Sequence, residues 1–389
     1  MDGTANETAT ISSDLPAFTC VLTGVYSPPV TPARRPRVIC GMSGGVDSSA
    51  TAALLLEQGY DVVGITLKLW PQDCVSRAED KCCGPQAVSD ARAVCHKLGI
   101  PFYLVDEAAE FQKHVIQYFA DEYKAGRTPN PCVMCNQNLK FGRLIDRADQ
   151  LGAEFIATGH FARLDRREDG RMLLKRGRDP RKDQSYFLFS LRQSQLARAL
   201  FPLGEKTKSD TRDVARHCRL KTAEKTESME ICFVPDNDYG KFLQTANLAQ
   251  SHRGEIVDAA GRVLGHHDGI EFYTVGQRKG LGITSPTPLY VLDLEPETNR
   301  VVVGDDSALA RDTFRVNPCN WIPFDQLEGP LEVTAKIRYN HPGTSATLTP
   351  TGYGRAEVKL HEPQRAITPG QAAVFYQDDL VVGGGWIER

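Results

Sequence analysis

The stretch VICGMSGGVDSSATAALLLEQGY, residues 38–60, combines the patterns that decide the fold of the chain around it. Val38-Ile39-Cys40 is typical of the end of a buried strand, and residues 48–58 carry apolar side chains at helical spacing until Gly59. A glycine-rich loop therefore connects a strand to the N-terminus of a helix. The backbone N–H groups of such a loop and the positive end of the helix dipole favour a bound phosphate.

This loop lacks the lysine of the common phosphate-binding pattern, G-x-x-x-x-G-K-[ST]. It offers the hydroxyl groups of Ser43, Ser48 and Ser49 and the carboxylate of Asp47, which predicts a Mg²⁺ ion held on the phosphates by Asp47. An ordinary strand-to-helix turn of small residues is the alternative. The string SGGVDSS resembles the signature of the ATP pyrophosphatases, which split ATP into AMP and pyrophosphate to adenylate a substrate oxygen.

Length and charge limit the number of domains and the classes of protein to which the chain could belong. A chain of 389 residues is long enough for two or three domains. Its net charge of -3 argues against a uniformly basic nucleic-acid binder, although 46 Lys and Arg residues leave room for a local basic groove. No apolar run approaches the roughly 20 residues of a membrane span. Residues 1–36 match neither a transit peptide nor a secretory signal, so we expect a disordered tail on a cytoplasmic protein.

Eleven cysteines without a secretory signal indicate thiol chemistry or metal binding rather than a disulfide framework. Cys40, Cys95 and Cys218 stand in apolar strand or helix settings and are predicted to be core thiols. A structural zinc site is the weaker prediction for a second group, because no further Cys or His pair stands near it; this group comprises Cys74, Cys82 and Cys83.

The patterns along the chain divide it into an α/β part and a β part. The first part alternates predicted strands and helices: strands at 61–70, 101–107 and 154–164, and helices at 87–100, 111–126 and 138–152. This order predicts a doubly wound parallel sheet, with the glycine loop and ATGH at 157–160 both at the carboxyl ends of strands. From about residue 250, short alternating runs predict two small, mostly β domains, the last a β-barrel. The predicted divisions are a tail at 1–36, a catalytic domain at 37–236, a central domain at 237–304 and the barrel domain at 305–389.

Two further stretches carry cysteines in reactive settings. RTPNPCVMCNQNLKFG places Cys132 and Cys135 in a C-x-x-C motif, predicted to lie on a loop near a helix start, where a thiolate is stabilised. Half of a structural metal site is the alternative. KTESMEICFVPDNDYGKFL places Cys232 in an apolar run, where a buried strand cysteine is the alternative. Adenylation combined with sulfur transfer would need the pyrophosphate loop, the C-x-x-C motif and this third thiol together.

This constellation resembles the tRNA-specific 2-thiouridylases of the MnmA type. The resemblance runs from about residue 37 to the C-terminus and includes GMSGGVDSS, NPCVMCN, ATGH, KDQSYFL, ESMEICF, TVGQRKGLG, KIRY and PGQAAVF. It implies an enzyme that uses ATP to adenylate the carbonyl oxygen at carbon 2 of the wobble uridine of tRNA. Sulfur from a cysteine persulfide then replaces that oxygen. A cysteine desulfurase or a sulfur-relay protein is the implied sulfur donor.

The resemblance also implies roles for individual residues. ATP binding falls to Gly41, Met42, Ser43, Gly44, Gly45, Val46, Asp47, Ser48, Leu67 and Gly159. Cys232 would carry the persulfide, and Cys135 would release its sulfur and leave a disulfide between the two. The target base would contact Asn130, Pro131 and Cys132. Other parts of the tRNA would contact Lys182, Asp183, Gln184, Arg338 and Tyr339. His160 and Gln371 match positions linked to tRNA selection.

Cys132 departs from the pattern, because some members have Asp at this position. A thiol there raises a second route, in which Cys132, Cys135 and Cys232 hold a [4Fe-4S] cluster whose open iron carries sulfide. We place the persulfide route first. Two other activities remain as alternatives: a different adenylating synthetase of the ATP pyrophosphatase class, and a sulfur carrier that binds ATP only for regulation.

Overall fold

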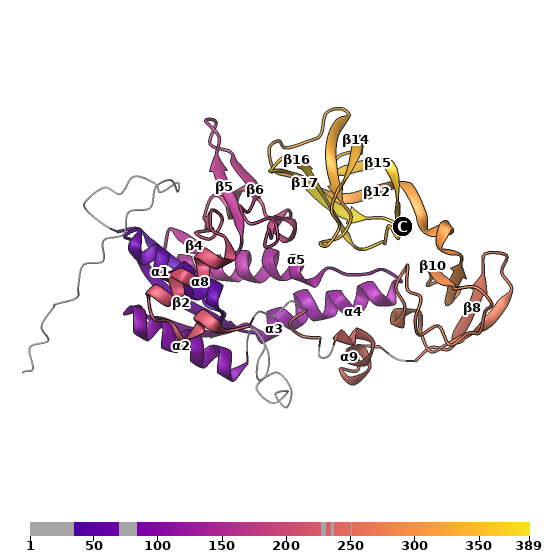
Figure 1. Ribbon diagram of the computed structural model, residues 1–389, viewed down its shortest axis with the longest axis horizontal. Helices are drawn as coiled ribbons and strands as arrows, with labels where there is room; N and C mark the ends of the chain where they lie inside the picture. Colours follow the sequence, from indigo (N-terminus) through magenta and orange to yellow (C-terminus); the bar gives the residue numbers. More distant parts are fainter. Residues whose placement is uncertain (1–34, 70–83, 227–230, 235–236, 250) are drawn as a thin grey trace, which may run out of the picture.

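The computed structural model describes residues 35–69, 84–226, 231–234, 237–249 and 251–389. The expectations for residues 1–34 of the tail, and for the zinc alternative at Cys74, Cys82 and Cys83, lie outside these residues. Figure 1 shows the α/β part at one end of the molecule, with the β-barrel and a four-stranded sheet toward the other end. Within the described ranges, no helix combines the length and apolar character that a membrane span requires.

A five-stranded parallel sheet in the order β3-β2-β1-β4-β7 forms the α/β part. Its strands are β1 (Arg37–Gly41), β2 (Asp61–Lys68), β3 (Phe102–Asp106), β4 (Phe155–Ala157) and β7 (Ala199–Leu200). Apolar residues fill β1 because both of its faces are covered. Val38 and Cys40 pack into one core cluster, whereas Ile39 between them packs into another on the opposite face.

Helices cover both faces of this sheet. One face packs against α1 (Val46–Glu57), α2 (Pro85–Leu98) and α8 (Lys208–His217). The other face packs against a long helix made of α5 (Pro131–Cys135), a π-helical stretch (Asn136–Arg143) and α6 (Leu144–Gln150). The prediction of a doubly wound parallel sheet is therefore confirmed. The remaining helical segments are α3 (Ala108–Phe111), a π-helical stretch (Gln112–Ile116), α4 (Gln117–Lys124), α7 (Gln193–Leu196), α9 (Tyr239–Thr245) and short 3₁₀ turns (Ser185–Leu188, Lys221–Glu224, Ile270–Phe272, Asp306–Leu309).

Two β structures follow, as predicted. The first is a four-stranded sheet in the order β10-β11-β8-β9, built from β8 (Gly254–Asp258), β9 (Val263–His267), β10 (Tyr290–Glu295) and β11 (Arg300–Gly304). The second is a barrel in the order β12-β15-β14-β13-β16-β17, closed by pairing of β12 with β17. Its strands are β12 (Ala310–Trp321), β13 (Leu331–Lys336), β14 (Thr344–Gly352), β15 (Arg355–Arg365), β16 (Ala372–Gln377) and β17 (Leu380–Ile387).

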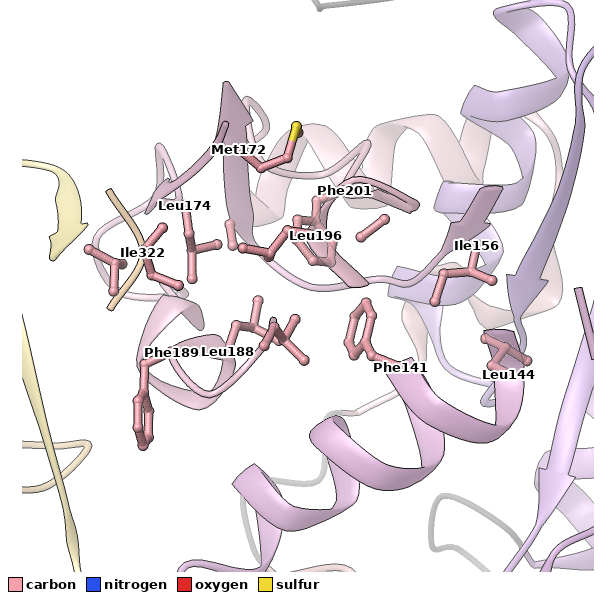
Figure 2. Packing of buried hydrophobic residues seen from close by; sticks show 14 of the residues in the cluster. Phe141, Leu144, Ile156, Met172, Leu174, Leu188, Phe189, Leu196, Phe201 and Ile322 are labelled. Atoms are coloured by element: carbon pink, nitrogen blue, oxygen red, sulfur yellow. The ribbon is translucent and has the colours of Figure 1, made fainter. Parts of the chain in front are cut away.

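A hairpin joins the α/β part to the barrel. Its strands, β5 (Ala162–Arg166) and β6 (Met172–Arg176), pair with each other, and β6 also pairs with barrel strand β17 through Lys175 and Leu380. One apolar core runs through this junction from Ile156 on β4 to Ile322 after β12 (Figure 2). The shared core fixes the barrel against the α/β part, which matters for the site described next.

Two local predictions were wrong. The stretch 154–164 is not one strand, because β4 ends at Ala157 and β5 starts at Ala162 in another sheet. The C-x-x-C motif does not lie on a loop, because α5 begins at Pro131 and contains both cysteines. Proline at the first helical position explains the early start, since its fixed φ suits that position and its missing N–H costs nothing there. The prediction of core thiols is confirmed for Cys40 and Cys95, and Cys218 lies half-buried at the edge of the same cluster.

Candidate active site

The glycine loop between β1 and α1 has the geometry of a phosphate-binding turn. Gly44 has a φ of 71°, in the left-handed region, and a Cβ there would lie 2.2 Å from the carbonyl oxygen of Ala87 on α2. The Ser48 hydroxyl accepts a hydrogen bond from the Ser43 N–H at 3.1 Å and donates to the Gly45 carbonyl at 3.2 Å. These contacts close the loop over the N-terminus of α1, where N–H groups and the helix dipole favour an anion.

A lysine from outside the loop reaches its acidic residue. Lys208 is the first residue of α8, and its Nζ donates to Asp47 Oδ1 at 2.6 Å. Thr207 caps this helix by accepting a hydrogen bond from the Asp210 N–H. The cap fixes where the helix begins and therefore the position of Lys208. Lys208 stands 161 residues from Asp47, so no local pattern could have shown the pairing. The cation that the loop lacks in sequence is thus supplied by a distant helix.

A second lysine, Lys225, reaches the same loop. Its Nζ donates to the Gly44 carbonyl at 3.2 Å and to Asp90 Oδ2 on α2 at 2.6 Å. Arg212 on α8 donates to the backbone carbonyls of Ala223 and Lys225, and so holds the chain on either side of Glu224. Sequence reasoning missed Lys208, Lys225 and Arg212, because each acts through tertiary contacts.

Other residues expected to bind ATP surround the loop. Gly159, after β4, lies directly over α1: a Cβ there would meet Asp47 Cβ at 2.9 Å and the Ser48 N at 3.0 Å. Leu67, near the carboxyl end of β2, is partly buried against two core clusters. Met42 and Val46 are buried. The structure therefore brings the loop, β2 and the turn after β4 to one edge of the sheet.

The C-x-x-C motif occupies the first turn of α5. Asn130 caps the helix, with its Oδ1 accepting from the Val133 N–H at 3.4 Å. Cys132 and Cys135 are three residues apart and so project from neighbouring positions on one helix face. Asn136 follows Cys135 and donates to the Phe187 carbonyl at 3.1 Å, while its buried Oδ1 accepts no hydrogen bond from any described residue.

Cys232 and Cys135 lie against the same apolar cluster. Both are partly buried, and both pack on a group that includes Phe111, Phe119 and Leu139. Cys232 lies in a turn rather than a strand, so the alternative of a buried strand cysteine is wrong. Phe233 beside it anchors this turn, because its ring packs edge-on against two other rings, with centroid distances of 5.0 Å to Phe119 and 5.8 Å to Phe111. The two cysteines, 97 residues apart in sequence, are thus brought to one region.

The segments expected to contact tRNA meet at the junction of the α/β part and the barrel. The Tyr339 hydroxyl donates to the Asp183 carbonyl at 3.3 Å, across 156 residues of sequence. The buried Asp183 carboxylate accepts from the Gly177 and Ser185 N–H groups, so it shapes the turn. Gln184 accepts from the Phe161 N–H, and Arg338 is exposed. Lys182 is half-buried on the same turn as Asp183.

His160 and Gln371 form hydrogen bonds with residues next to the candidate site. The buried His160 ring lies 2.8 Å from the Thr158 hydroxyl, and burial, followed by the nearby Lys140 charge, lowers the pKa of His160 well below its usual value. Gln371 Nε2 donates to the carbonyls of Thr128 and Pro129 at 3.4 and 3.3 Å. The barrel thereby holds the chain immediately before the Asn130 cap.

Within the described ranges, no three His, Cys, Asp or Glu side chains converge on a point where a metal ion could bind. Cys132, Cys135 and Cys232 are all among the described residues, and they do not converge on one metal ion. The Asp47 carboxylate is the type of hard oxygen ligand that Mg²⁺ requires, and it stands at the phosphate-binding loop.

Comparison with known families covers nearly the whole described chain. A model described as tRNA methyl transferase HUP domain matches residues 36–236. One described as tRNA methyl transferase PRC-barrel domain matches residues 240–305, and one described as Aminomethyltransferase beta-barrel domain matches residues 311–387.

Individual proteins are also similar. A tRNA-specific 2-thiouridylase MnmA from Geobacter metallireducens is 50% identical over 363 residues, which span 92% of this chain and 98% of that protein. A protein of the same description from Clostridium perfringens strain 13 is 49% identical over 353 residues, or 90% of this chain and 98% of its own length. A solved 4-thiouridine synthetase–RNA complex with bound ATP matches 55% of this chain and 51% of its own at 18% identity, with a TM-score of only 0.36. The chain belongs to the family of MnmA-type tRNA-specific 2-thiouridylases.

Proposed function

We propose that this protein is an ATP-dependent tRNA 2-thiouridylase that works on the wobble uridine. The observation that carries the proposal is the placement of Cys135 and Cys232 on one apolar cluster, in a fold whose glycine loop is built for phosphates. Relatives about 50% identical over nearly their full length are named for this activity. A phosphate loop alone would equally suit another adenylating synthetase, but such an enzyme has no need of the paired thiols.

The first half of the reaction activates the uridine. The carbonyl oxygen at carbon 2 attacks the α-phosphorus of ATP, pyrophosphate leaves, and the oxygen becomes part of AMP, a good leaving group. Loop N–H groups near Gly44 and the Lys208 and Lys225 ammonium groups stabilise the negative charge of the departing pyrophosphate. Mg²⁺ held through Asp47 would supply further charge neutralisation there.

The second half transfers sulfur. The terminal sulfur of a Cys232 persulfide attacks carbon 2 and AMP leaves, which joins Cys232 to the base through two sulfur atoms. The Cys135 thiolate then attacks the Cys232 sulfur, which releases 2-thiouridine and leaves a Cys135–Cys232 disulfide for an external thiol to reduce. The shared apolar surroundings of the two cysteines support this assignment. Cys132 needs no covalent role on this route, and with Asn130 and Pro131 it would face the target base.

Sulfur reaches Cys232 from a partner in this proposal. A cysteine desulfurase or a sulfur-relay protein would load the persulfide, and the reaction would take place in the cytoplasm. The competing route through a [4Fe-4S] cluster would instead require Cys132, Cys135 and Cys232 to act as equivalent ligands. We place it second, because the packing of Cys135 and Cys232 on one apolar cluster suits a route that uses these two thiols as a pair.

The test is a single-turnover assay with purified protein whose Cys232 has first been loaded from a persulfide donor, to which ATP, Mg²⁺ and unmodified tRNA are added. We expect 2-thiouridine, measured by nucleoside mass spectrometry, and AMP to form in a one-to-one ratio. Asp47→Ala should abolish AMP formation and leave tRNA binding nearly intact. AMP without 2-thiouridine would favour a different adenylating synthetase, and 2-thiouridine without AMP would remove the adenylation step from the proposal.

A further inference from the structure

The helix that carries Cys132 and Cys135 is not α-helical along its whole length. It runs without a break through the described residues 131–150, but its middle, Asn136–Arg143, is π-helical and starts directly after Cys135. A π turn contains more residues than an α turn, which has about 3.6. Side chains before the π-helical stretch are therefore rotated about the helix axis, relative to the positions that an unbroken α-helix would give them.

This rotation matters because the two ends of the helix pack in different places. Leu144 and Ala148 on α6 pack in the core cluster that covers the parallel sheet. Cys135 and Leu139 instead lie on the apolar cluster that Cys232 shares. Since the sheet fixes α6, the geometry of the stretch between them decides the direction in which Cys135 leaves the helix. A change of this stretch to α-helix would turn Cys135 away from its place on the cluster.

One side chain from another element binds the π-helical stretch at two points. Gln195 on α7 donates from its Nε2 to the Gln137 carbonyl at 3.0 Å and to the Phe141 carbonyl at 2.6 Å. Its Oε1 accepts from the Arg192 N–H at 3.0 Å, so both ends of the amide are held. The neighbouring Leu196 is buried in the same core cluster as Phe141 (Figure 2). Helix α7 is thus a fixed support beside the π-helical stretch.

These contacts explain why the stretch keeps its unusual geometry. π-helical turns are rare, and a side chain that enters the backbone hydrogen-bond ladder is one of the recognised causes of a departure from regular α geometry. The Gln195 amide is such a side chain, because it donates to carbonyls near both ends of the stretch. Its removal would take a hydrogen bond from each carbonyl and separate the stretch from α7.

We propose that Gln195 is a positioning residue that sets the direction of Cys135 by holding the π-helical stretch. The helix then presents the Cys135 thiol to the cluster that Cys232 shares. Gln195 acts through the helix and takes no part in making or breaking bonds. The inference rests on the proposed function, because the attack of Cys135 on the Cys232 sulfur is the step that needs this direction.

The first experiment measures how fast iodoacetamide alkylates each thiol of the full-length protein without ATP or tRNA, with the cysteine peptides quantified by mass spectrometry. Gln195→Glu removes both donated hydrogen bonds but keeps the acceptor for Arg192, and Gln195→Met removes the donors without adding a charge. Both variants should alkylate Cys135 about tenfold faster, the change expected from the loss of about one net hydrogen bond. Cys40 and Cys95, which are fully buried, should stay as protected as in the unmodified protein.

Gln193→Glu is the matched control. Gln193 stands on the same helix, and its Nε2 also donates to two carbonyls, but these belong to Met172 and Ile322 at the junction of the hairpin and the barrel. This variant should leave the Cys135 rate unchanged.

Three results of the alkylation experiment would overturn the inference. The first is a Cys135 rate that stays the same in both Gln195 variants. The second is a rate that rises equally in Gln193→Glu. The third is a rise that Cys40 and Cys95 share, because Gln195 would then only stabilise the fold.

A second measurement separates sulfur release from adenylation. In the single-turnover assay with loaded Cys232, both Gln195 variants should form AMP at the rate of the unmodified protein but about tenfold less 2-thiouridine per AMP. The missing base should remain joined to Cys232 through two sulfur atoms, and dithiothreitol added afterwards should release it in place of Cys135. A one-to-one ratio in both variants would overturn the inference. An unmodified protein that forms AMP without 2-thiouridine would instead contradict the proposed function, and the alkylation rates would still decide what Gln195 does to Cys135.

Discussion

At the scale of single residues, the site depends on close backbone approaches that only glycine permits. Gly44 brings the loop against α2, and Gly159 brings the turn after β4 against Asp47 and Ser48. The loop could be predicted from sequence because its glycines and the neighbouring helix pattern are adjacent. The charges that complete it could not be predicted, because Lys208 and Lys225 reach the loop across 161 and 181 residues.

Gly159→Ala tests the close approach. The added methyl group would lie 2.9 Å from Asp47 Cβ and 3.0 Å from the Ser48 backbone N, so the loop must shift from its position at the start of α1. We expect kcat/KM for ATP to fall roughly 10- to 100-fold, as small misplacements of reacting groups do. Gly329→Ala is the control, since a Cβ there meets no atom within 4 Å. Equal kinetics in both variants would show that Gly159 is not needed at the loop.

At the scale of elements, two structures position the cysteines of the C-x-x-C motif and the residues proposed to contact tRNA. The helix that begins at Pro131 holds Cys132 and Cys135 on one face, although the local sequence suggested a loop. The β5–β6 hairpin was harder to predict, because apolar residues stand on both sides of Thr158-Gly159-His160 and the pairing of β6 with barrel strand β17 is a tertiary contact. By contrast, the alternation of strands and helices before it was sufficient to predict the parallel sheet.

Lys182 and Arg338 test whether the turn after β6 and the barrel form one tRNA-binding surface. They come from segments joined by the hydrogen bond from Tyr339 to Asp183. If each contacts a phosphate, Lys182→Ala and Arg338→Ala should each weaken tRNA binding and lower the slope of log affinity against log salt by about one. Filter binding over a range of salt concentrations measures this slope. Lys359→Ala, which removes an exposed barrel lysine, should leave it unchanged. Unaltered slopes in both test variants would contradict the shared surface.

At the scale of the whole molecule, buried histidines in all three parts make stability depend on pH. Desolvation is the largest cause that lowers the pKa of His160 in the α/β part, His267 in the central sheet and His341 after β13. The unfolded chain, with pKa values near 6.5, binds more protons than the folded chain as pH falls. Stability should therefore be full above about pH 7 and decline as pH falls through 6.5.

His160→Gln tests this dependence. The variant should lose less stability than the unmodified protein between pH 8 and pH 5, because one buried neutral group that resists protonation is gone. Each such group contributes up to about 1.4 kcal/mol per pH unit below its unfolded pKa. Thermal melts give the melting temperature of each variant at each pH. Comparing it with the melting temperature of the same variant at pH 8 separates this effect from a general loss of stability. The exposed His252→Gln is the control. A pH profile for His160→Gln that runs parallel to that of the unmodified protein would contradict the account.

The most direct test of the central claim follows sulfur onto the individual thiols. Iron-free preparations of Cys132→Ser, Cys135→Ser and Cys232→Ser are incubated with a ³⁵S-labelled persulfide donor, and then with ATP and tRNA. The account predicts that Cys135→Ser accepts label but forms no 2-thiouridine, that Cys232→Ser accepts no label at this step, and that Cys132→Ser keeps substantial thiolation without iron. Loss of activity in all three variants, together with iron that all three fail to retain when purified anaerobically, would contradict it and support a cluster held by the three cysteines.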